Sequence, residues 1–158
     1  MCSHYQAPTA DHLADAFGSE GQLTLQLDLW PGYQGAFVRA AIDDPDNDFE
    51  LLPGIFGLLP AWAKDQKLAR HTYNARPETV ASRRTVPTRF TRADGGMMCI
   101  AGLWEQWKDP AGQIIHSYSM LTINADEHPL FRHYHRAEDE KRMVVILPNG
   151  LIRDWLKA

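Results

Sequence analysis

The alternation of apolar and polar positions predicts a chain built mainly of β-strands. The clearest case is residues 23–29, where four leucines alternate with polar residues, as in a strand with one buried face. Comparable apolar runs predict further strands over residues 36–42, 52–59, 98–104, 114–123 and 144–147. The last of these runs is apolar throughout, which is typical of a strand in the centre of a sheet.

Short helices are expected near the two ends of the sequence. Thr9 can cap a helix that runs through Phe17 and ends at Gly18, and residues 151–156 have the pattern of a closing helix. The turn sequence at 109–112 predicts that the strands on either side of it form an antiparallel hairpin. Because no repeat or Pro/Gly/Ser-rich linker divides the sequence, we expect one domain over residues 1–158. The predicted class is α+β, with a mostly antiparallel sheet and flanking helices.

The composition limits the classes of protein that fit. At 158 residues and 44% hydrophobic, the chain is long enough for one core. No apolar run approaches the roughly 20 residues of a membrane span, and no signal peptide is evident after Met1. Two cysteines are too few for a disulfide framework, and the apolar surroundings of Cys99 predict a buried free thiol. We therefore expect an intracellular protein in a reducing compartment, with no membrane partner.

The distribution of charge is more informative than the net charge of −4. Between residues 61 and 92 only Asp65 and Glu78 oppose a basic strip made of Lys64, Lys67, Arg70, Arg76, Arg83, Arg84, Arg89 and Arg92. Such a strip on an acidic protein can hold a polyanion, although the same residues also suit an ordinary solvated surface.

Cys2 brings together two nucleophiles if Met1 is removed, because its α-amine and its thiol then lie on adjacent carbons. An aldehyde would form a Schiff base with the amine, and the thiolate would close a five-membered thiazolidine ring. The amine titrates near ~7.7–8.0 and the thiol near ~8.5, so part of each is nucleophilic at neutral pH. Position alone favours a cysteine without a chemical role.

Three polar segments beside apolar runs are the other candidates for chemistry. Trp62, with Lys64 close behind it, suits stacking on an unpaired base, although a core tryptophan at a strand-to-helix corner fits the same spacing. In residues 73–79 an extended backbone would point Asn74 and Arg76 to the same side, where Asn74 can orient a sugar or carbonyl and Arg76 can bind a phosphate. A structural salt bridge of Arg76 is the competing interpretation.

A histidine near residue 135 can move protons at neutral pH, or it can be an ordinary surface residue. The three histidines of this region do not match common zinc spacings and no cysteine cluster accompanies them, so we expect no metal and no cofactor; they are His128, His133 and His135.

Six motifs in a fixed order make the chain resemble the SOS response-associated peptidase (SRAP) family. They are Met1-Cys2-Ser3-His4-Tyr5, Phe56 to Lys64, Asn74-Ala75-Arg76-Pro77-Glu78-Thr79, Arg92-Ala93-Asp94-Gly95 leading to Ala101-Gly102-Leu103-Trp104, Leu121 to Ala125, and His135 before Arg142 to Pro148. Together they span nearly the whole chain. The resemblance implies an α+β fold with a twisted, barrel-like sheet.

The same resemblance implies a function and assigns residues to it. Members of the family form a thiazolidine between the N-terminal cysteine and the ring-opened aldehyde of an abasic site in single-stranded DNA. Lyase-type release and peptidase activity are further family expectations, as is a location in the bacterial cytoplasm in association with the nucleoid. The expected catalytic residues are Cys2 as nucleophile, Asn74 orienting the aldehyde and His135 assisting ring opening and proton transfer; the expected DNA contacts are Trp62, Lys64, Arg76 and Arg142.

The chain departs from the family pattern at two places. Ser3 and His4 replace the usual glycine and arginine, which removes or weakens one phosphate-binding cation. Between about residues 80 and 90 a longer family segment, which carries a catalytic glutamate, is missing or shortened. Either the protein possesses this segment and the printed sequence omits it, or the protein is a natural shortened variant. Glu105 lies on a later predicted strand and does not match the position of that glutamate.

Two other functions remain open at this level. A cysteine hydrolase or autoprotease would use Cys2 on an acyl group, with His135 as base and Asn74 as oxyanion donor. A degenerate single-stranded DNA-binding module would keep Trp62 and the basic strip without the chemistry. The sequence does not indicate an oligomeric state.

Overall fold

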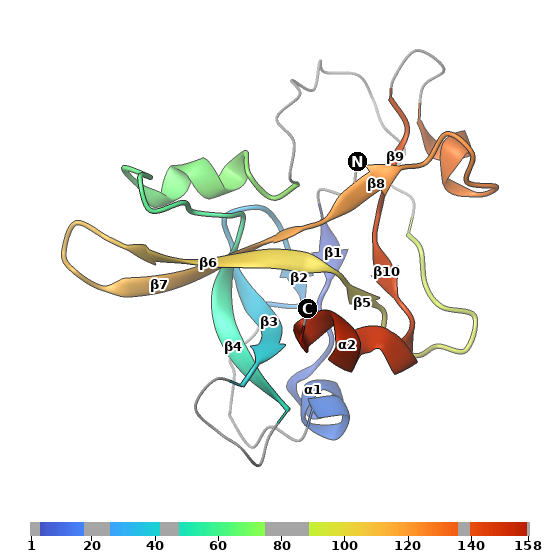
Figure 1. The fold of residues 1–158 in the computed structure, drawn as a ribbon, viewed down its shortest axis with the longest axis horizontal. Helices are drawn as coiled ribbons and strands as arrows, with labels where there is room; N and C mark the ends of the chain where they lie inside the picture. Colours follow the sequence, from blue (N-terminus) through green and yellow to red (C-terminus); the bar gives the residue numbers. More distant parts are fainter. Residues whose placement is uncertain (1–3, 18–25, 42–47, 75–88, 136–139, 158) are drawn as a thin grey trace.

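The computed structural model describes residues 4–17, 26–41, 48–74, 89–135 and 140–157 (Figure 1). Its strands are β1 (Tyr5–Gln6), β2 (Asp28–Leu29), β3 (Gln34–Ala40), β4 (Phe49–Phe56), β5 (Cys99–Ile100), β6 (Gly102–Lys108), β7 (Ile114–Met120), β8 (Thr122–Asn124), β9 (Arg142–Val144) and β10 (Ile146–Leu147). The helices are α1 (Ala10–Phe17) and α2 (Ile152–Lys157), with 3₁₀ turns η1 (Gln66–Arg70), η2 (Phe131–Tyr134) and η3 (Asn149–Leu151). The mixed class with mostly antiparallel pairing agrees with the prediction.

The largest sheet joins two antiparallel hairpins in the order β3-β4-β7-β6. Among the described residues, the parallel contact within this sheet is the central one, where β4 meets β7 at two positions, Ile55 with Ser117 and Phe56 with Tyr118. Beyond these pairs the hairpins run apart, the β6–β7 hairpin to the left of Figure 1 and β3 with β4 downward. The predicted turn at 109–112 is confirmed, with the backbone N–H of Gly112 donating to the carbonyl of Asp109.

Strand β4 ends at Gly57 because the backbone there turns into a left-handed conformation, with φ +127°. A Cβ atom at this position would lie 1.9 Å from the carbonyl oxygen of Ala69 in η1. The strand predicted over residues 52–59 is therefore wrong in its last part. The positive φ redirects the chain from the sheet into the segment that leads to η1.

Three predicted strands are each interrupted at one residue, and the three interruptions meet. Ala101 separates β5 from β6, Leu121 separates β7 from β8, and Val145 separates β9 from β10. The N–H of Ala101 donates to the carbonyl of Val145, that of Val145 to Leu121, and that of Leu121 to Ala101, at 2.9 to 3.0 Å. The pairing partners change at this three-residue junction: β6 pairs with β7 on one side of it, whereas β5 pairs with β10 and β8 pairs with β9 beyond it.

Two other sequence predictions require correction, while the helix predictions hold. Among the described residues the strands form one four-stranded and three two-stranded sheets, so they do not close into a barrel. In the 23–29 strand, residues 23–25 lie outside the described residues, and Leu27 is 48% exposed whereas Leu29 is fully buried. The reason is that β2 pairs with β1 at only two positions and begins after Leu27. The helix capped by Thr9 and the closing helix are both present.

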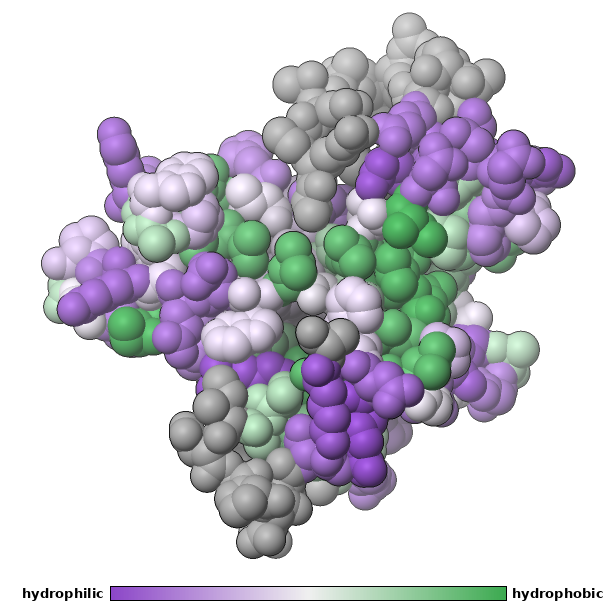
Figure 2. Space-filling model, in the orientation of Figure 1, coloured by the Kyte–Doolittle hydropathy of each residue, from purple (hydrophilic) through white to green (hydrophobic). Residues whose placement is uncertain are grey.

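The core consists of two groups of buried residues on opposite faces of the central sheet. The Trp107 cluster contains Ile55, Leu59, Ala69 and Trp107. The Phe56 cluster contains Phe56, Tyr118, Met120 and Val144. In Figure 2 apolar residues gather across the middle of the visible face and hydrophilic residues surround them. Cys99 is a free, partly buried thiol, and burial raises its pKa.

Candidate functional site

The segments that flank two predicted catalytic residues meet at the buried ring of Phe56. Tyr5, three residues after Cys2, packs edge-on against this ring with centroids 5.2 Å apart. Tyr73, which directly precedes Asn74, packs against it in the same manner at 5.8 Å. Cys2 itself lies outside the described residues. The Phe56 cluster thus brings the chain near its amino end next to the segment that carries Asn74.

Asn74 is held against the central sheet by backbone contacts. It forms an isolated parallel bridge with Met120, and the N–H of Met120 donates to the carbonyl of Tyr73 at 2.9 Å. Bridged residues share a face of a sheet, so Asn74 lies on the same face as Met120, a member of the Phe56 cluster. The residue is only 5% exposed. An amide in such a dry setting can bind a carbonyl oxygen strongly.

A pair of tyrosine hydroxyls fixes β1 to the centre of the sheet. The oxygens of Tyr5 and Tyr118 lie 2.6 Å apart. Burial raises the pKa of Tyr5 to about 12 and also raises the pKa of Tyr118, so both stay protonated except at strongly alkaline pH. Gly35 makes room for the pair, because a Cβ atom there would lie 2.4 Å from the Tyr118 hydroxyl. The sequence assigned neither tyrosine a role: Tyr5 belongs to the first motif without a stated function, and Tyr118 belongs to no motif.

Removing one hydroxyl of this pair should cost more than removing both. Tyr118→Phe leaves the Tyr5 hydroxyl away from water without its partner, at a cost of about 1–3 kcal/mol in unfolding free energy. The double variant Tyr5→Phe/Tyr118→Phe leaves neither group unsatisfied. Urea unfolding of the wild type, both single variants and the double variant measures the coupling. If the two single costs simply add in the double variant, the pair does not anchor β1.

His135 follows η2, and both of its ring nitrogens contact the backbone. The N–H of Arg142 donates to Nε2 at 3.2 Å, and Nδ1 lies 3.1 Å from the carbonyl oxygen of Phe131. Because Nε2 accepts, the proton resides on Nδ1 and is donated to that carbonyl. The ring therefore ties β9 to η2, and β9 carries Val144 of the Phe56 cluster. For His135 to transfer a proton, it must release one of these bonds.

The guanidinium of Arg142 joins β8 to β9. Its Nε and Nη2 donate to the hydroxyl and the carbonyl of Thr122 at 3.1 and 2.8 Å, and Nη1 donates to Glu140 at 2.8 Å. The side chain is 17% exposed. Its predicted DNA contact stays a prediction, and the described bonds give it a structural role in addition.

Trp62 projects outward from an anchored turn. The N–H of Ala63 donates to the carbonyl of Pro60, and the indole N–H of Trp107 donates to the carbonyl of Ala63 at 2.9 Å. Ala63 therefore packs inward, while Trp62 is 75% exposed. This exposure rules out the interpretation of Trp62 as a core residue. Lys64 is also exposed beside it, and Arg76 lies outside the described residues.

His4, which stands where the family usually has arginine, is held by two neighbours. Its ring stacks on Trp30 with centroids 4.4 Å apart, and its Nε2 lies 3.3 Å from a carboxylate oxygen of Asp28. A nearby carboxylate opposes the binding of a phosphate, so this departure weakens one expected DNA contact.

Glu105 lies on the face of the sheet opposite to the Phe56 cluster. In the β6–β7 register it pairs with Ser117, whereas its neighbour Trp104 pairs with Tyr118. Successive strand residues point to opposite faces, so Glu105 faces away from Asn74.

No group of three His, Cys, Asp or Glu side chains in the described part of the chain is arranged to hold a metal ion. None of the helices described is long and apolar enough to cross a membrane.

Comparisons with known sequences agree on one family. The model for the family described as SOS response associated peptidase (SRAP) matches residues 1–86 and 81–158. The abasic site processing protein YoqW of Bacillus subtilis is 26% identical over 170 positions, covering 90% of this chain and 71% of that protein. The abasic site processing protein YoaM of the same organism is 25% identical over 188 positions, covering 99% and 79%.

Solved structures show the same fold. A crystal structure of a protein from Bordetella bronchiseptica is similar with a TM-score of 0.80 and 40% identity, over 99% of this chain and 89% of that one. A protein from Bacteroides thetaiotaomicron has a TM-score of 0.64 at 16% identity, over 98% and 81%, which bears on the fold alone.

Proposed function

Because the chain belongs to the SOS response associated peptidase (SRAP) family, we propose that it processes abasic sites in single-stranded DNA by forming a covalent cross-link through Cys2. The observation that carries the proposal is the meeting of Tyr5 and Tyr73 at the ring of Phe56. Tyr5 lies three residues after Cys2 and Tyr73 directly precedes Asn74, so these contacts support an approach of the two predicted catalytic residues. The names of the Bacillus subtilis relatives, abasic site processing proteins, support the same substrate.

The proposed reaction joins nitrogen and sulfur of Cys2 to one carbon of the lesion. The α-amine adds to the aldehyde carbon of the ring-opened sugar, and loss of water gives a Schiff base. The thiolate then adds to the carbon of the C=N bond, the nitrogen takes up a proton, and a thiazolidine results. Asn74 donates its amide N–H to the aldehyde oxygen, and His135 moves the proton that opens the sugar ring.

The DNA strand would be held by a stacking contact and by cations. Trp62, exposed on its anchored turn, packs against a base that flanks the lesion. Lys64, Arg76 and Arg142 contact phosphates, which makes binding salt-dependent. For Arg142 such a contact requires exchange of its bond to Glu140 or Thr122.

The reaction would proceed without the glutamate of the longer family segment. The match to YoaM extends over 188 positions, which exceeds the 158 residues of this chain. YoaM therefore has residues within the matched region that this chain does not have. The two ranges matched by the family model meet at residues 81–86, which supports a shortened segment at that point. Because amine and thiol react without a carboxylate, we expect slower cross-linking than in relatives that keep the glutamate.

The test uses an oligonucleotide with one abasic site and protein from which Met1 has been removed, as verified by mass spectrometry. Wild-type protein should form an adduct that survives denaturing electrophoresis. Cys2→Ala should abolish it, since both the thiol and the ring closure are lost. Cys99→Ala, which removes the other cysteine, is the matched control and should retain the adduct. An adduct that persists in Cys2→Ala, or a retained Met1, would contradict the proposal.

A further inference from the structure

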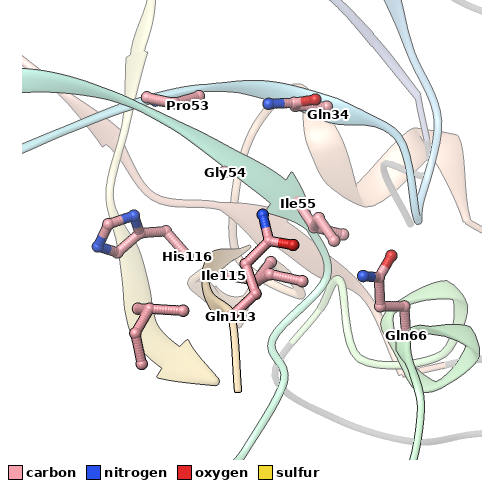
Figure 3. A pocket seen from close by; sticks show the side chains of 9 residues that line it. Gln34, Pro53, Gly54, Ile55, Gln66, Gln113, Ile115 and His116 are labelled. Carbon is pink, nitrogen blue, oxygen red and sulfur yellow. The ribbon is translucent and has the colours of Figure 1, made fainter. Parts of the chain in front are cut away.

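A cavity of about 350 Å³ opens where the two hairpins of the central sheet separate. Strands β4 and β7 pair at only two positions, and residues nearer the start of each strand line the gap between them. Gly54 and Ile55 contribute from β4, and Ile115 and His116 from β7 (Figure 3). The volume is in the range of small-ligand sites.

Three glutamine side chains surround this cavity. Gln34 belongs to β3, Gln66 to η1, and Gln113 precedes β7, and Figure 3 shows all three around the side chain of Ile55. Each amide presents both a hydrogen-bond donor and an acceptor. All three residues are exposed to solvent, so an entering molecule can reach their amides without rearrangement of the core.

The lining that the structure describes carries no formal charge at neutral pH. It contains no Asp, Glu, Lys or Arg. Burial, and to a smaller degree the positive charge of Arg39, lower the pKa of His116, which keeps its ring neutral. A phosphate or another ion is therefore a poor match. The lining suits a neutral molecule that has donors and acceptors along its edge.

The floor of the cavity is apolar. Ile55 belongs to the Trp107 cluster, and Ile115 packs against the same cluster. A flat ring that lies on these side chains can turn its polar edge to the glutamine amides. An unpaired nucleobase has this combination of apolar faces and a donor–acceptor edge.

We propose that this cavity receives an unpaired nucleobase of the DNA strand to which the protein is bound. The proposal rests on the proposed function, and the chain order supports it. Gln66 follows Lys64 by two residues, and the same segment carries Trp62. Its members Ala63 and Leu68 pack on the Trp107 cluster, on which the floor of the cavity also rests. The turn that carries Trp62 and the floor of the cavity therefore share one supporting cluster, and the proposal requires that a strand stacked on Trp62 extends to the cavity.

The experiment separates reversible binding from cross-linking. Binding is measured by fluorescence anisotropy in a Cys2→Ala background, with a set of single-stranded oligonucleotides that each carry one abasic site. In each oligonucleotide one further base, at a different distance from the lesion, is replaced by a baseless spacer. The cavity predicts one distance at which this omission weakens binding about 10-fold. In Gln66→Ala/Gln113→Ala the same omission should have no further effect.

Gln26→Ala is the matched control, because Gln26 is exposed and does not line the cavity. It should retain the 10-fold effect. In a separate experiment, free nucleosides at millimolar concentration compete with the oligonucleotide for binding. If nucleosides compete but the position of the spacer has no effect on binding, the cavity is a site for free nucleosides and the proposal is overturned. An unchanged spacer profile in Gln66→Ala/Gln113→Ala would overturn it as well. Cross-link yield with Cys2 intact is scored separately, so a failure of the chemistry is distinguishable from a failure of the cavity.

Discussion

Gly57→Ala is expected to lower the free energy of unfolding by about 3–5 kcal/mol, because two costs act at once. The backbone has φ +127°, where a residue with a Cβ atom is strained. The new methyl group would lie 1.9 Å from the carbonyl oxygen of Ala69, a backbone atom of a fully buried residue. Relief would require η1 to move away from β4. Guanidinium unfolding monitored by circular dichroism measures the loss.

Alanine variants of two other glycines separate the cost of backbone strain from the cost of the steric clash. Gly112 also has a positive φ, but the nearest atom to an added Cβ is the flexible Lys108 side chain at 3.7 Å. Gly112→Ala should therefore show only the backbone cost, about 1–2 kcal/mol. An added Cβ at Gly150 meets nothing within 4 Å, and Gly150→Ala should be nearly neutral. If Gly57→Ala is no worse than Gly112→Ala, the close approach of η1 to β4 is wrong.

Trp107→Ala and Trp62→Ala should give opposite results although the two side chains belong to neighbouring parts of the fold. Trp107 is 2% exposed, packs in its cluster and donates to the carbonyl of Ala63, so its truncation should cost about 3–5 kcal/mol in unfolding free energy. Trp62 is 75% exposed, and its truncation should change stability by no more than about 0.5 kcal/mol.

Trp62→Ala, which should hardly change stability, is expected to weaken binding to single-stranded DNA. Loss of the Trp62 ring should weaken binding by about 1–3 kcal/mol, the typical contribution of one base stacked on an aromatic side chain. Fluorescence anisotropy on folded Trp62→Ala protein, at fixed salt, measures this loss. Trp62→Phe is the matched control and should retain most of the affinity. Unchanged affinity in Trp62→Ala would remove this residue from the DNA surface.

The features that the sequence predicted well depend on neighbouring residues. The 109–112 turn and the Thr9 cap have local chemical causes, and both are found in the structure. The parallel contact of β4 with β7 and the hydroxyl pair of Tyr5 and Tyr118 join residues far apart in the chain, and no local pattern encodes them. Leu27 shows the limit of periodicity, because alternation predicts a face but not where pairing begins.

The sequence motifs identified residues of the candidate site, but they did not indicate the hydrogen bonds that those residues form or how far they are buried. The order of motifs indicated Trp62 and Asn74, and the structure adds that the first is exposed and the second buried. Spacing gave no sign that both ring nitrogens of His135 contact backbone groups. Nor did it indicate the three glutamines around the cavity, which belong to elements that only the folded sheet brings together.

The junction of Ala101, Leu121 and Val145 restricts where insertions and deletions can be accommodated during evolution. Its three hydrogen bonds form a closed ring, and a single residue added beside any member would move the side chains of the following strand to the opposite face. Homologues should therefore gain or lose segments in the connections between these strands, and conserve the spacing within a few residues of each crossing point.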